Sequence, residues 1–396
     1  MRKGWEYKKL GEVTSFFRGL TYSGKDEVDK SNNIVLRSNN IDLSTNSLNF
    51  DELKFISDSI TIPQDKKLRK NSIFMCMSNG SKQHLGKVAF IEKEYPYAFG
   101  GFMGLIVPNE DKLVPKFTYY YFCSQKFKAY LSAIGNGANI NNIKYIDIAK
   151  DSIPLPPLST QLAIVTELDK INELIRLKKE QLKDFDNLAQ SLFYEMFGDP
   201  VENEKGWEMK KLGEIGEVKT GNTPSRSNDN FYNEKFIEWI KTDNIRNEQM
   251  NPTTAAEYLS RDGAECGRIV SKGSILVACI AGSLSSIGKC CITTKNVAFN
   301  QQINAITPYG DFCNSIYLYE LIRNSYKYIQ QNATTGMKHI LSKSVFEKMK
   351  FPLPPLSLQR LFAQRIEQIE REKTEVQKSI QDLETLLASR MQYWFE

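Results

Sequence analysis

The segment Gly4–Val13 reads GWEYKKLGEV and Gly206–Ile215 reads GWEMKKLGEI, so eight of ten positions are identical at an offset of 202 residues. A second pair follows, because Pro154–Gln161 is PLPPLSTQ and Pro352–Gln359 is PLPPLSLQ, at an offset of 198. The similar offsets indicate that one unit of about 200 residues is duplicated. The duplication predicts two similar working surfaces in one chain, which suits a partner that has its own repeat or two-fold character.

The bulk composition is that of a globular protein. The 396 residues favour two or three domains, each able to bury its own core, and 25% of them are charged while 41% are hydrophobic. No apolar run approaches the roughly 18 residues of a membrane span. The first residues, MRKGWEYKKLGE, contain no apolar stretch typical of a secretory signal, so we expect a cytoplasmic protein with no membrane partner.

The cysteines and histidines give no metal-site pattern. There are seven cysteines and only two histidines, and no C-x-x-C motif occurs. We therefore expect reduced thiols and no metal site.

Charge is distributed unevenly along the chain. Residues 1–155 carry 22 basic and 16 acidic side chains (+6), and residues 200–353 carry 19 and 16 (+3). The intervening segments are mildly acidic: residues 156–199 carry 5 and 8 (−3), and residues 354–396 carry 6 and 7 (−1). We take these four segments as domain 1, a first helix, domain 2 and a second helix. A polyanionic partner should therefore bind the two basic domains.

Each basic domain is predicted to be α+β with a β-rich core. Short apolar or alternating runs between polar turns are typical of strands, and the same places in both copies have them. The predicted strands are Ile34–Leu36, Ser72–Met77, Lys87–Ile91 and Met103–Val107 in the first copy, and Glu238–Ile240, Ser274–Ile280, Lys289–Ile292 and Ile303–Thr307 in the second. Apolar residues at three-to-four spacing predict one helix in each copy, Tyr119–Ala133 and Asn314–Gln331.

Two long helices follow the proline-rich motifs, since their apolar residues repeat in steps of three and four. The predicted contact positions are Leu168, Ile171, Ile175, Lys178, Leu182, Phe185, Ala189, Leu192 and Met196 in the first helix, and Ile366, Ile369, Lys373, Val376, Ile380, Leu383, Leu387, Arg390 and Trp394 in the second. Lys178, Lys373 and Arg390 interrupt the pattern. A helix of this length is a rod of roughly 57 Å.

The short connector after the first helix favours an antiparallel pair of helices. Residues 198–205 cannot span the return that a parallel pair requires, whereas an antiparallel coiled coil relates the two domains by a pseudo-two-fold axis. The alternative is that each helix packs only on its own domain.

Three polar loops recur at matched places in the two copies. They are rich in Asn, Ser, Thr, Lys, Arg and Gly, whose side chains donate to phosphates and base edges. The alternative reading of each single loop is an ordinary turn. The loops are Arg18–Lys25 and Lys219–Ser227, Arg37–Asn40 and Lys241–Asn244, and Asn136–Lys144 and Thr334–Lys343.

No catalytic motif is complete in this sequence. Gly282–Lys289 resembles a phosphate-binding loop but has five residues between its glycines and Cys290 at the magnesium-binding position, and Gly80–Lys87 fails in the same way. We interpret both as connections between strands. No adenine-methyltransferase tetrapeptide, G-x-S-x-G motif or nuclease-like acidic spacing is found.

Together, the GWE-x-KKLGE openings, the PLPPLS-x-Q motifs, the long helix after each and the end of the first helix, Ser191–Phe197, resemble the specificity subunit of type I restriction–modification enzymes. The resemblance covers the whole chain. It implies two target recognition domains that each read half of a split, asymmetric DNA sequence, and a helical spacer that binds two methyltransferase subunits. It also implies two restriction subunits, and adenine methylation and cleavage by these partners, which bind S-adenosylmethionine, ATP and Mg²⁺. A subunit of this kind binds no cofactor and has no catalytic residues.

The resemblance and the loop chemistry together give a set of predicted DNA contacts. Half-sites read from one face of B-DNA lie about 34–36 Å apart, centre to centre. For one half-site we expect Arg18, Lys25, Arg37, Asn39, Asn40, Asn139, Asn141 and Lys144, and for the other Lys219, Asn222, Thr223, Arg226, Lys241, Asn244, Arg246, Thr335 and Lys338. Two other classes stay open: a stand-alone nuclease or methyltransferase, and a scaffold that binds DNA without sequence preference.

Overall fold

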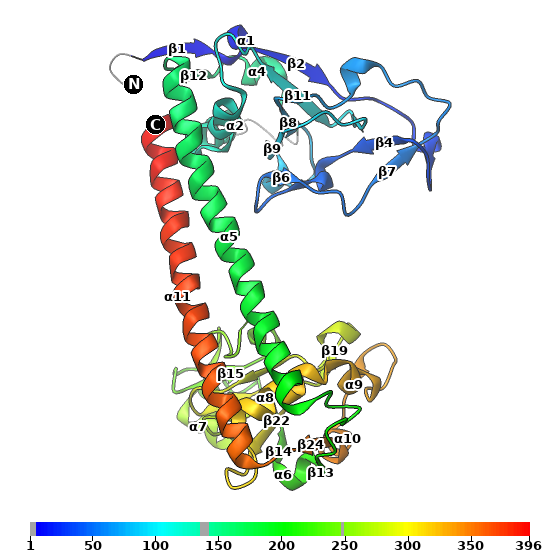
Figure 1. Ribbon diagram of the computed structural model, residues 1–396, viewed down its shortest axis with the longest axis vertical. Helices are drawn as coiled ribbons and strands as arrows, with labels where there is room; N and C mark the ends of the chain where they lie inside the picture. Colours follow the sequence, from blue (N-terminus) through cyan, green and yellow to red (C-terminus); the bar gives the residue numbers. More distant parts are fainter. Residues whose placement is uncertain (1–4, 135–141, 247–248) are drawn as a thin grey trace. The chain divides into compact units, whose positions relative to one another are not determined.

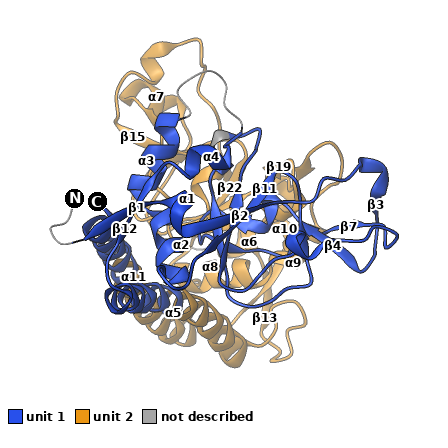
Figure 2. Cartoon of the chain, turned by 90° about the horizontal axis from the view of Figure 1, so that it is seen from above, with its two compact units in different colours: residues 1–178, 379–396 blue, residues 179–378 orange. Residues whose placement is uncertain are grey.

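The computed structural model describes residues 5–134, 142–246 and 249–396 (Figure 1). The chain divides into two compact units, which Figure 2 colours separately: unit 1 is residues 1–178 with 379–396, and unit 2 is residues 179–378. Two 40-residue helices, α5 (Leu158–Phe197) and α11 (Leu356–Phe395), each contribute one end to either unit.

The globular part of unit 1 consists of short strands and helices that precede α5 in the chain. The elements are β1 (Glu6–Lys9), α1 (Leu10–Val13), β2 (Thr14–Arg18), η1 (Gly24–Asp26), β3 (Glu27–Val28), β4 (Asn33–Leu36), η2 (Ser38–Asn40), β5 (Ile41–Asp42), β6 (Ser47–Leu48), β7 (Lys54–Ile56), η3 (Gln64–Lys66), β8 (Ser72–Cys76), η4 (Lys82–His84), β9 (Val88–Ile91), β10 (Ala98–Phe99), β11 (Met103–Pro108), α2 (Pro115–Cys123), α3 (Gln125–Ile134), α4 (Tyr145–Ile148) and β12 (Ser152–Leu155).

Unit 2 repeats this order with small variations. Its elements are β13 (Glu208–Lys211), α6 (Leu212–Ile215), β14 (Gly216–Thr220), η5 (Asp229–Phe231), β15 (Ile237–Ile240), η6 (Thr242–Asn244), β16 (Tyr258–Leu259), α7 (Arg261–Cys266), β17 (Ile269–Val270), β18 (Ile275–Ala278), β19 (Ile280–Ala281), η7 (Leu284–Ser286), β20 (Cys290–Ile292), β21 (Val297–Phe299), β22 (Ile303–Pro308), α8 (Ser315–Asn324), α9 (Tyr326–Gln331), β23 (His339–Ile340), α10 (Lys343–Lys348) and β24 (Lys350–Leu353).

The main sheets of the two units have the same topology. Strand order β2-β11-β8-β9 in unit 1 corresponds to β14-β22-β18-β20 in unit 2, and all pairs are antiparallel. A second sheet in each unit contains one parallel pair, β4 with β10 and β15 with β21. Helices α2 and α8 cover the equivalent strands of the first sheet. The α+β class and the internal repeat are therefore confirmed, and each predicted strand overlaps an observed one.

The predicted helices Tyr119–Ala133 and Asn314–Gln331 are each two helices. Buried Ser124 leaves the helical conformation (φ −68°, ψ 154°), and its hydroxyl donates to Tyr121 O (2.6 Å) and accepts from Phe127 N (3.3 Å), which ends α2 and starts α3. Ser325, also buried, separates α8 from α9. The apolar spacing continues across both serines, so it could not reveal the breaks.

The two repeated sequence motifs are neighbours in space. In unit 1 the GWE-x-KKLGE strand β1 pairs with the PLPP strand β12, and in unit 2 the strand β13 pairs with β24 in the same antiparallel register. Each motif's tryptophan packs against the end of a long helix: Trp5 stacks on Trp394 of α11, and Trp207 Nε1 donates to Phe197 O of α5 (2.9 Å). The residues of the repeated motifs therefore form the joint, which is the contact between each globular part and the ends of the long helices.

A buried glutamine fixes the start of each long helix. Gln161 is fully buried, and its amide accepts from Val114 N (2.8 Å) and donates to Lys112 O and Pro156 O (both 2.9 Å). Gln359 makes the same three bonds in unit 2, to Asn314 N, Phe312 O and Pro354 O. This satisfied amide explains why the last letter of PLPPLS-x-Q is the same in both copies.

Helices α5 and α11 pack together in an antiparallel arrangement. In unit 2, Asp186 of α5 contacts Lys373 of α11, and further along α5 the rings of Phe193 and Phe197 lie 5.8 and 5.1 Å from Phe362, which precedes Lys373 in the chain. Every predicted contact position is buried or half-buried.

Two of the polar residues that interrupt the helix pattern form ion pairs. Lys373 is 5% exposed and its Nζ lies 3.0 Å from Asp186 and 2.8 Å from Glu370. In unit 1, Arg390 pairs with Glu167, which also accepts from Trp394 Nε1 (3.1 Å). Burial without such partners would be costly for either cation.

The two connections that resemble phosphate loops join strands, as predicted. Gly80–Lys87 links β8 to β9, and Gly282–Lys289 links β19 to β20. Each loop closes on a glycine with positive φ, Gly86 (+76°) and Gly288 (+86°), and a Cβ atom at Gly86 would lie 2.4 Å from Leu131 Cδ1. These glycines therefore serve the turn and the packing of the loop.

Candidate nucleic-acid interface

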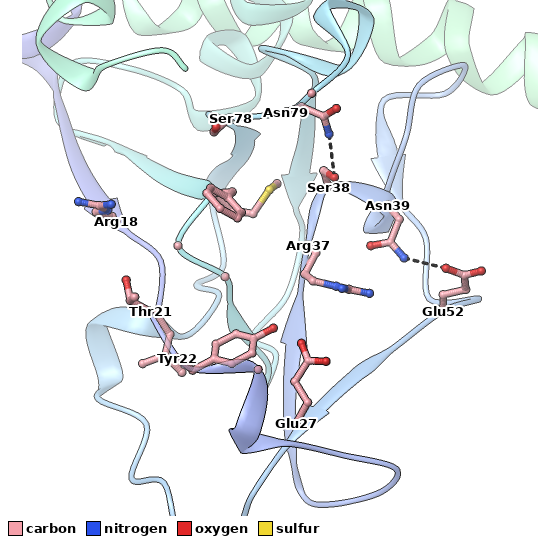
Figure 3. Close-up of a pocket in the computed structure, with 17 residues that line it drawn as sticks. Arg18, Thr21, Tyr22, Glu27, Arg37, Ser38, Asn39, Glu52, Ser78 and Asn79 are labelled. Carbon is pink, nitrogen blue, oxygen red and sulfur yellow. Dashed lines mark hydrogen bonds between the residues drawn. The ribbon is translucent and has the colours of Figure 1, made fainter. Parts of the chain in front are cut away.

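The polar loops of unit 1 surround a cavity of about 790 Å³ (Figure 3). Five segments line it: the stretch from the end of β2 to β3, the turn around η2, the loop between β6 and β7, the residues after β8, and the turn between β10 and β11. The lining residues are Arg18, Leu20, Thr21, Tyr22, Gly24, Glu27, Arg37, Ser38, Asn39, Glu52, Ser78, Asn79, Gly80, Gly100, Gly101, Phe102 and Met103. Loops that are far apart in the sequence thus form one concave surface that carries both polar and apolar groups.

Hydrogen bonds and charges organise the wall of this cavity. Asn39 Nδ2 donates to Glu52 Oε2 (3.1 Å), and Asn79 Nδ2 donates to Ser38 Oγ (3.0 Å). In Figure 3 the Arg37 side chain is drawn between those of Asn39 and Glu27, and its Nε atom is buried without a hydrogen-bond partner among the described residues. The Arg37 Nε–H is therefore an unsatisfied buried donor in the wall of the cavity.

Among the described residues, the cavity contains one tyrosine, Tyr22. Burial raises the pKa of the Tyr22 hydroxyl, and the neighbouring Glu27 carboxylate adds to the rise. The phenol therefore remains a donor at neutral pH.

The structure brings only some of the predicted residues of unit 1 together. Arg18, Arg37 and Asn39 line the cavity. Lys25 lies in η1 and Lys144 just before α4; both are exposed, and neither lines the cavity. The predicted contacts Asn139 and Asn141 lie outside the described residues.

Two predicted contacts, Asn40 and Asn244, are corrected by the structure. Asn40 is fully buried: its Oδ1 accepts from Arg37 N (2.7 Å), and its Nδ2 donates to Asn49 O (3.0 Å) and Glu52 O (2.8 Å). Asn244 is 7% exposed. Its Oδ1 accepts from Lys241 N, and its Nδ2 donates to Thr253 Oγ1 and Thr254 O. These amides hold the turn, both of their N–H donors are used, and their burial keeps them from a base, so we remove both residues from the predicted contacts.

In unit 2 a single carboxylate joins two of the predicted cations. Glu257 lies 2.5 Å from Arg226 Nη2 and also pairs with Lys241. The Arg226 guanidinium lies over the rings of Tyr232 (4.4 Å) and Trp239 (4.8 Å). The hydrogen bond from Lys241, followed by that from Arg226, lowers the pKa of Glu257, so the carboxylate is ionised and holds both cations in place.

We call the ion-paired residues Arg226, Glu257 and Lys241 the clamp of unit 2. Other predicted residues of this unit lie next to it. Asn222 Nδ2 donates to Cys266 O (2.8 Å), its Oδ1 accepts from Arg268 N (2.7 Å), and its carbonyl accepts from Trp239 Nε1 (3.3 Å). Thr223 is hydrogen-bonded to Gln301 of the turn between β21 and β22. The loop after β14, the turn around η6 and the β21–β22 turn therefore form one surface, as their counterparts do in unit 1.

The remaining predicted contacts of unit 2 lie outside the clamp. Lys219 is half-buried in β14 and pairs with Glu217 (2.9 Å), while Arg246, Thr335 and Lys338 are exposed.

Some residues of the two surfaces were not predicted from the sequence. They are the carboxylates Glu27, Glu52 and Glu257, the aromatic residues Tyr22, Phe102, Tyr232 and Trp239, and the amides Asn79 and Gln301. Two of them had a usable signal: Tyr22 stands inside the predicted loop Arg18–Lys25, and a phenylalanine among Gly100, Gly101 and Gly104 marks an exposed turn.

The described residues show neither a metal-binding cluster nor a membrane-spanning helix. In the part of the chain that the structure describes, no group of three or more His, Cys, Asp or Glu residues could hold a metal ion. Among the described helices, none has both the length and the apolar character required to cross a bilayer. All seven cysteines are unpaired, and five of them are buried.

Comparison with known proteins gives matches along the whole chain. The sequence matches the family described as type I restriction modification DNA specificity domain twice, over residues 2–184 and 204–385. The specificity subunit of the type I restriction enzyme EcoKI from Escherichia coli (strain K12) is 26% identical over 201 residues, which are 50% of this chain and 43% of that subunit. The HindI specificity subunit from Haemophilus influenzae is 32% identical over 166 residues, 41% of this chain and 35% of that subunit. The matched part of the chain thus spans less than half the length of either relative.

Longer but weaker similarities extend over nearly the entire chain. A putative MjaX specificity subunit from Methanocaldococcus jannaschii is 22% identical, with 97% of this chain and 92% of that subunit covered. A solved structure from work on complex assembly and conformational transition of the type I R-M system aligns with a TM-score of 0.62 and 18% identity, covering 99% of this chain and 97% of that one. The S subunit of a type I system from M. genitalium aligns with a TM-score of 0.56 and 15% identity over 100% of this chain and 98% of that one. These structures share the fold.

Proposed function

This chain belongs to the family of type I restriction–modification DNA specificity domains, and from that premise we propose that it is the DNA-recognition subunit of such a complex. Residues 1–155 and 200–353 would be its target recognition domains, each reading one half of a bipartite DNA sequence. The chain itself would perform no catalysis. Adenine methylation and cleavage would be carried out by partner subunits that bind S-adenosylmethionine, ATP and Mg²⁺.

One observation carries this proposal: two copies of one fold present the same loops with different side chains. Unit 1 offers a cavity with Arg18, Arg37 and Asn39, whereas unit 2 offers the Arg226–Glu257–Lys241 clamp. Arginine and lysine recognise guanine and phosphate, and amides recognise adenine. Two unlike reading surfaces on equal supports favour an asymmetric target with different half-sites.

The long helices offer surfaces for the proposed protein partners. Several of their leucines point to solvent and are 45–54% exposed. They occur on both helices: Leu162, Leu174, Leu177 and Leu188 on α5, and Leu361 and Leu386 on α11. Because the helices follow equivalent joints in the two repeats, they suit two copies of one partner. We therefore propose two methyltransferase subunits on the helices and two restriction subunits in the full complex.

The test is a selection of binding sites from random duplex DNA, run on the chain reconstituted with its methyltransferase partner. We expect a bipartite, asymmetric motif. A bound pool without any motif would contradict sequence-specific recognition and would support a scaffold. The chain alone, incubated with S-adenosylmethionine, Mg²⁺ and plasmid, should neither methylate nor cut the DNA; activity there would identify a stand-alone enzyme.

A matched pair of variants tests the division of labour between the units. Arg18→Ala in unit 1 and Arg226→Ala in unit 2 each remove one exposed arginine of a reading surface. Each variant should relax selection in one half of the motif only, by about 1–3 kcal/mol if the arginine contacts a base. If a residue contacts only phosphate, its variant should weaken binding to all sequences and reduce the salt dependence. Equal relaxation of both halves by one variant would refute the assignment.

A further inference from the structure

The turn between β10 and β11 and its counterpart between β21 and β22 have the same backbone scheme. In unit 1 the carbonyl of Phe102 accepts from the two amides of Met77 and Ser78 (2.9 and 3.1 Å). In unit 2 the carbonyl of Gln302 accepts from Cys279 N and Ile280 N (2.8 and 3.2 Å). The turn is therefore held rigidly in both units, with Phe102 and Gln302 at equivalent positions.

The side chains at this position differ in a way that the fold does not require. Phe102 is 73% exposed, so its ring contributes little to the core. Gln302 is half-buried, and its Oε1 accepts from Asn300 Nδ2 (3.0 Å). Since glutamine satisfies the same backbone role in unit 2, the phenyl ring of unit 1 is not needed to form the turn.

The phenyl ring lies among groups suited to DNA. Phe102 lines the same cavity as Arg18, Arg37 and Asn39, whose donors can bind phosphates and the acceptors of base edges. The phenyl ring of Phe102 cannot hydrogen-bond to those acceptors. The apolar group that the major groove presents is the 5-methyl group of thymine, and phenylalanine is one of the side chains that contact it.

We propose that Phe102 is a specificity-determining residue of unit 1 that packs its ring against the methyl group of a thymine in the DNA half-site bound by this unit. This inference rests on the proposed function, since it presumes that unit 1 reads DNA. Because the backbone of the turn is already fixed, no backbone ordering cost is added when the ring binds. At the same turn unit 2 presents the amide of Gln302, so the contact belongs to one half-site.

The experiment is a double-mutant cycle between the protein and the DNA, with the chain reconstituted with its methyltransferase partner. After the target is selected, each thymine of the unit 1 half-site is replaced in turn by deoxyuridine, which removes only the methyl group. With the unchanged chain, one replacement should weaken binding about fourfold, the effect of removing one buried methyl group. With Phe102→Ala, that replacement should have no effect, because the partner of the methyl group is already absent.

Phe312→Ala is the matched control, since this phenylalanine of unit 2 is also exposed (57%) and lies outside the reading loops. It should keep the fourfold sensitivity to deoxyuridine. The inference is overturned if no thymine of the half-site shows sensitivity, or if Phe102→Ala keeps the sensitivity of the unchanged chain. Failure to select any bipartite target would instead refute the proposed function, so the two failures are distinguishable.

Discussion

Replacing Arg323 with methionine should destabilise unit 2 through the carboxyl group of Glu320. Glu320 is 2% exposed on α8, and Arg323 Nη1 lies 3.4 Å from its Oε1. Arg323 Nη2 also contacts Asp186 Oδ1 at 3.1 Å, which ties α8 to α5. Asp186 keeps Lys373 as a partner in the variant, but Glu320 loses its closest cation.

The expected cost is about 3 kcal/mol at pH 8, the lower end of the range for removing one partner of a buried pair. The lower end applies because Asn324 Nδ2 still donates toward Glu320 Oε2 (3.4 Å). Burial raises the pKa of Glu320, and Arg323 opposes that rise. Without Arg323 the folded-state pKa lies further above the unfolded value, so folded-state stability is lost as the pH rises through it. The deficit should therefore be smaller at pH 5 than at pH 8.

Calorimetry can measure this loss, with peptide-resolved hydrogen exchange to assign the transition to unit 2. For a unit of this size, about 3 kcal/mol lowers the melting temperature by roughly 6–12 °C. Glu320→Gln in the same chain should recover part of the loss by removing the buried charge. The control is Arg176→Met, since Arg176 and its partner Glu173 are both 52% exposed and a solvent-exposed pair contributes far less to stability than a buried one. A deficit equal to the control, or the same at both pH values, would refute the reasoning.

Three further substitutions test the turn, the joint and the core. Asn40→Ala should cost about 1–3 kcal/mol in urea unfolding, because buried groups of the turn lose their partner, while Asn39→Ala should cost far less; similar midpoints would contradict a structural role for Asn40. Gln161→Ala should increase hydrogen exchange at the start of α5 by leaving the Val114 N–H and the carbonyls of Lys112 and Pro156 unpaired, and unchanged exchange there would contradict the role of Gln161 in fixing the helix start. Phe395→Ala should destabilise unit 1 by about 3–5 kcal/mol, read as faster exchange in its core helix α2, and an effect confined to unit 2 would be inconsistent with the packing.

Local patterns were enough to predict the main elements of the fold. The predicted strand Met103–Val107 corresponds to β11. A short run of apolar residues of this length fits a strand that is buried on both faces. The helix pattern also located Lys373 in the contact between helices, although a lysine there looked like an interruption. Its partner Asp186 is 187 residues away, so only the folded chain could show how its charge is compensated.

The reading surfaces were harder to predict, because loop chemistry does not reveal which side chains a loop needs for itself. Asn40 is a residue type that commonly contacts DNA. Its side-chain amide, however, donates to the backbone carbonyls of Asn49 and Glu52, nine and twelve residues further along the chain. Glu257 was missed for a related reason: its carboxylate reaches Arg226 across 31 residues, and no local pattern marks that contact. The repeat could identify matched loops in the two copies, but it could not show which residues within a loop face a ligand and which hold the loop itself.

The use of both helices by each unit has a consequence for how the chain is made. Phe395 is 2% exposed, and its ring lies 5.1 Å from Phe117 and 5.9 Å from Tyr121, within the core of the unit that leaves the ribosome first. Domains usually fold in the order of their synthesis, at about 5–20 residues per second. In this chain the core of the first unit is completed only by residues 379–396, so its final packing comes after the 200 residues of unit 2 have been translated.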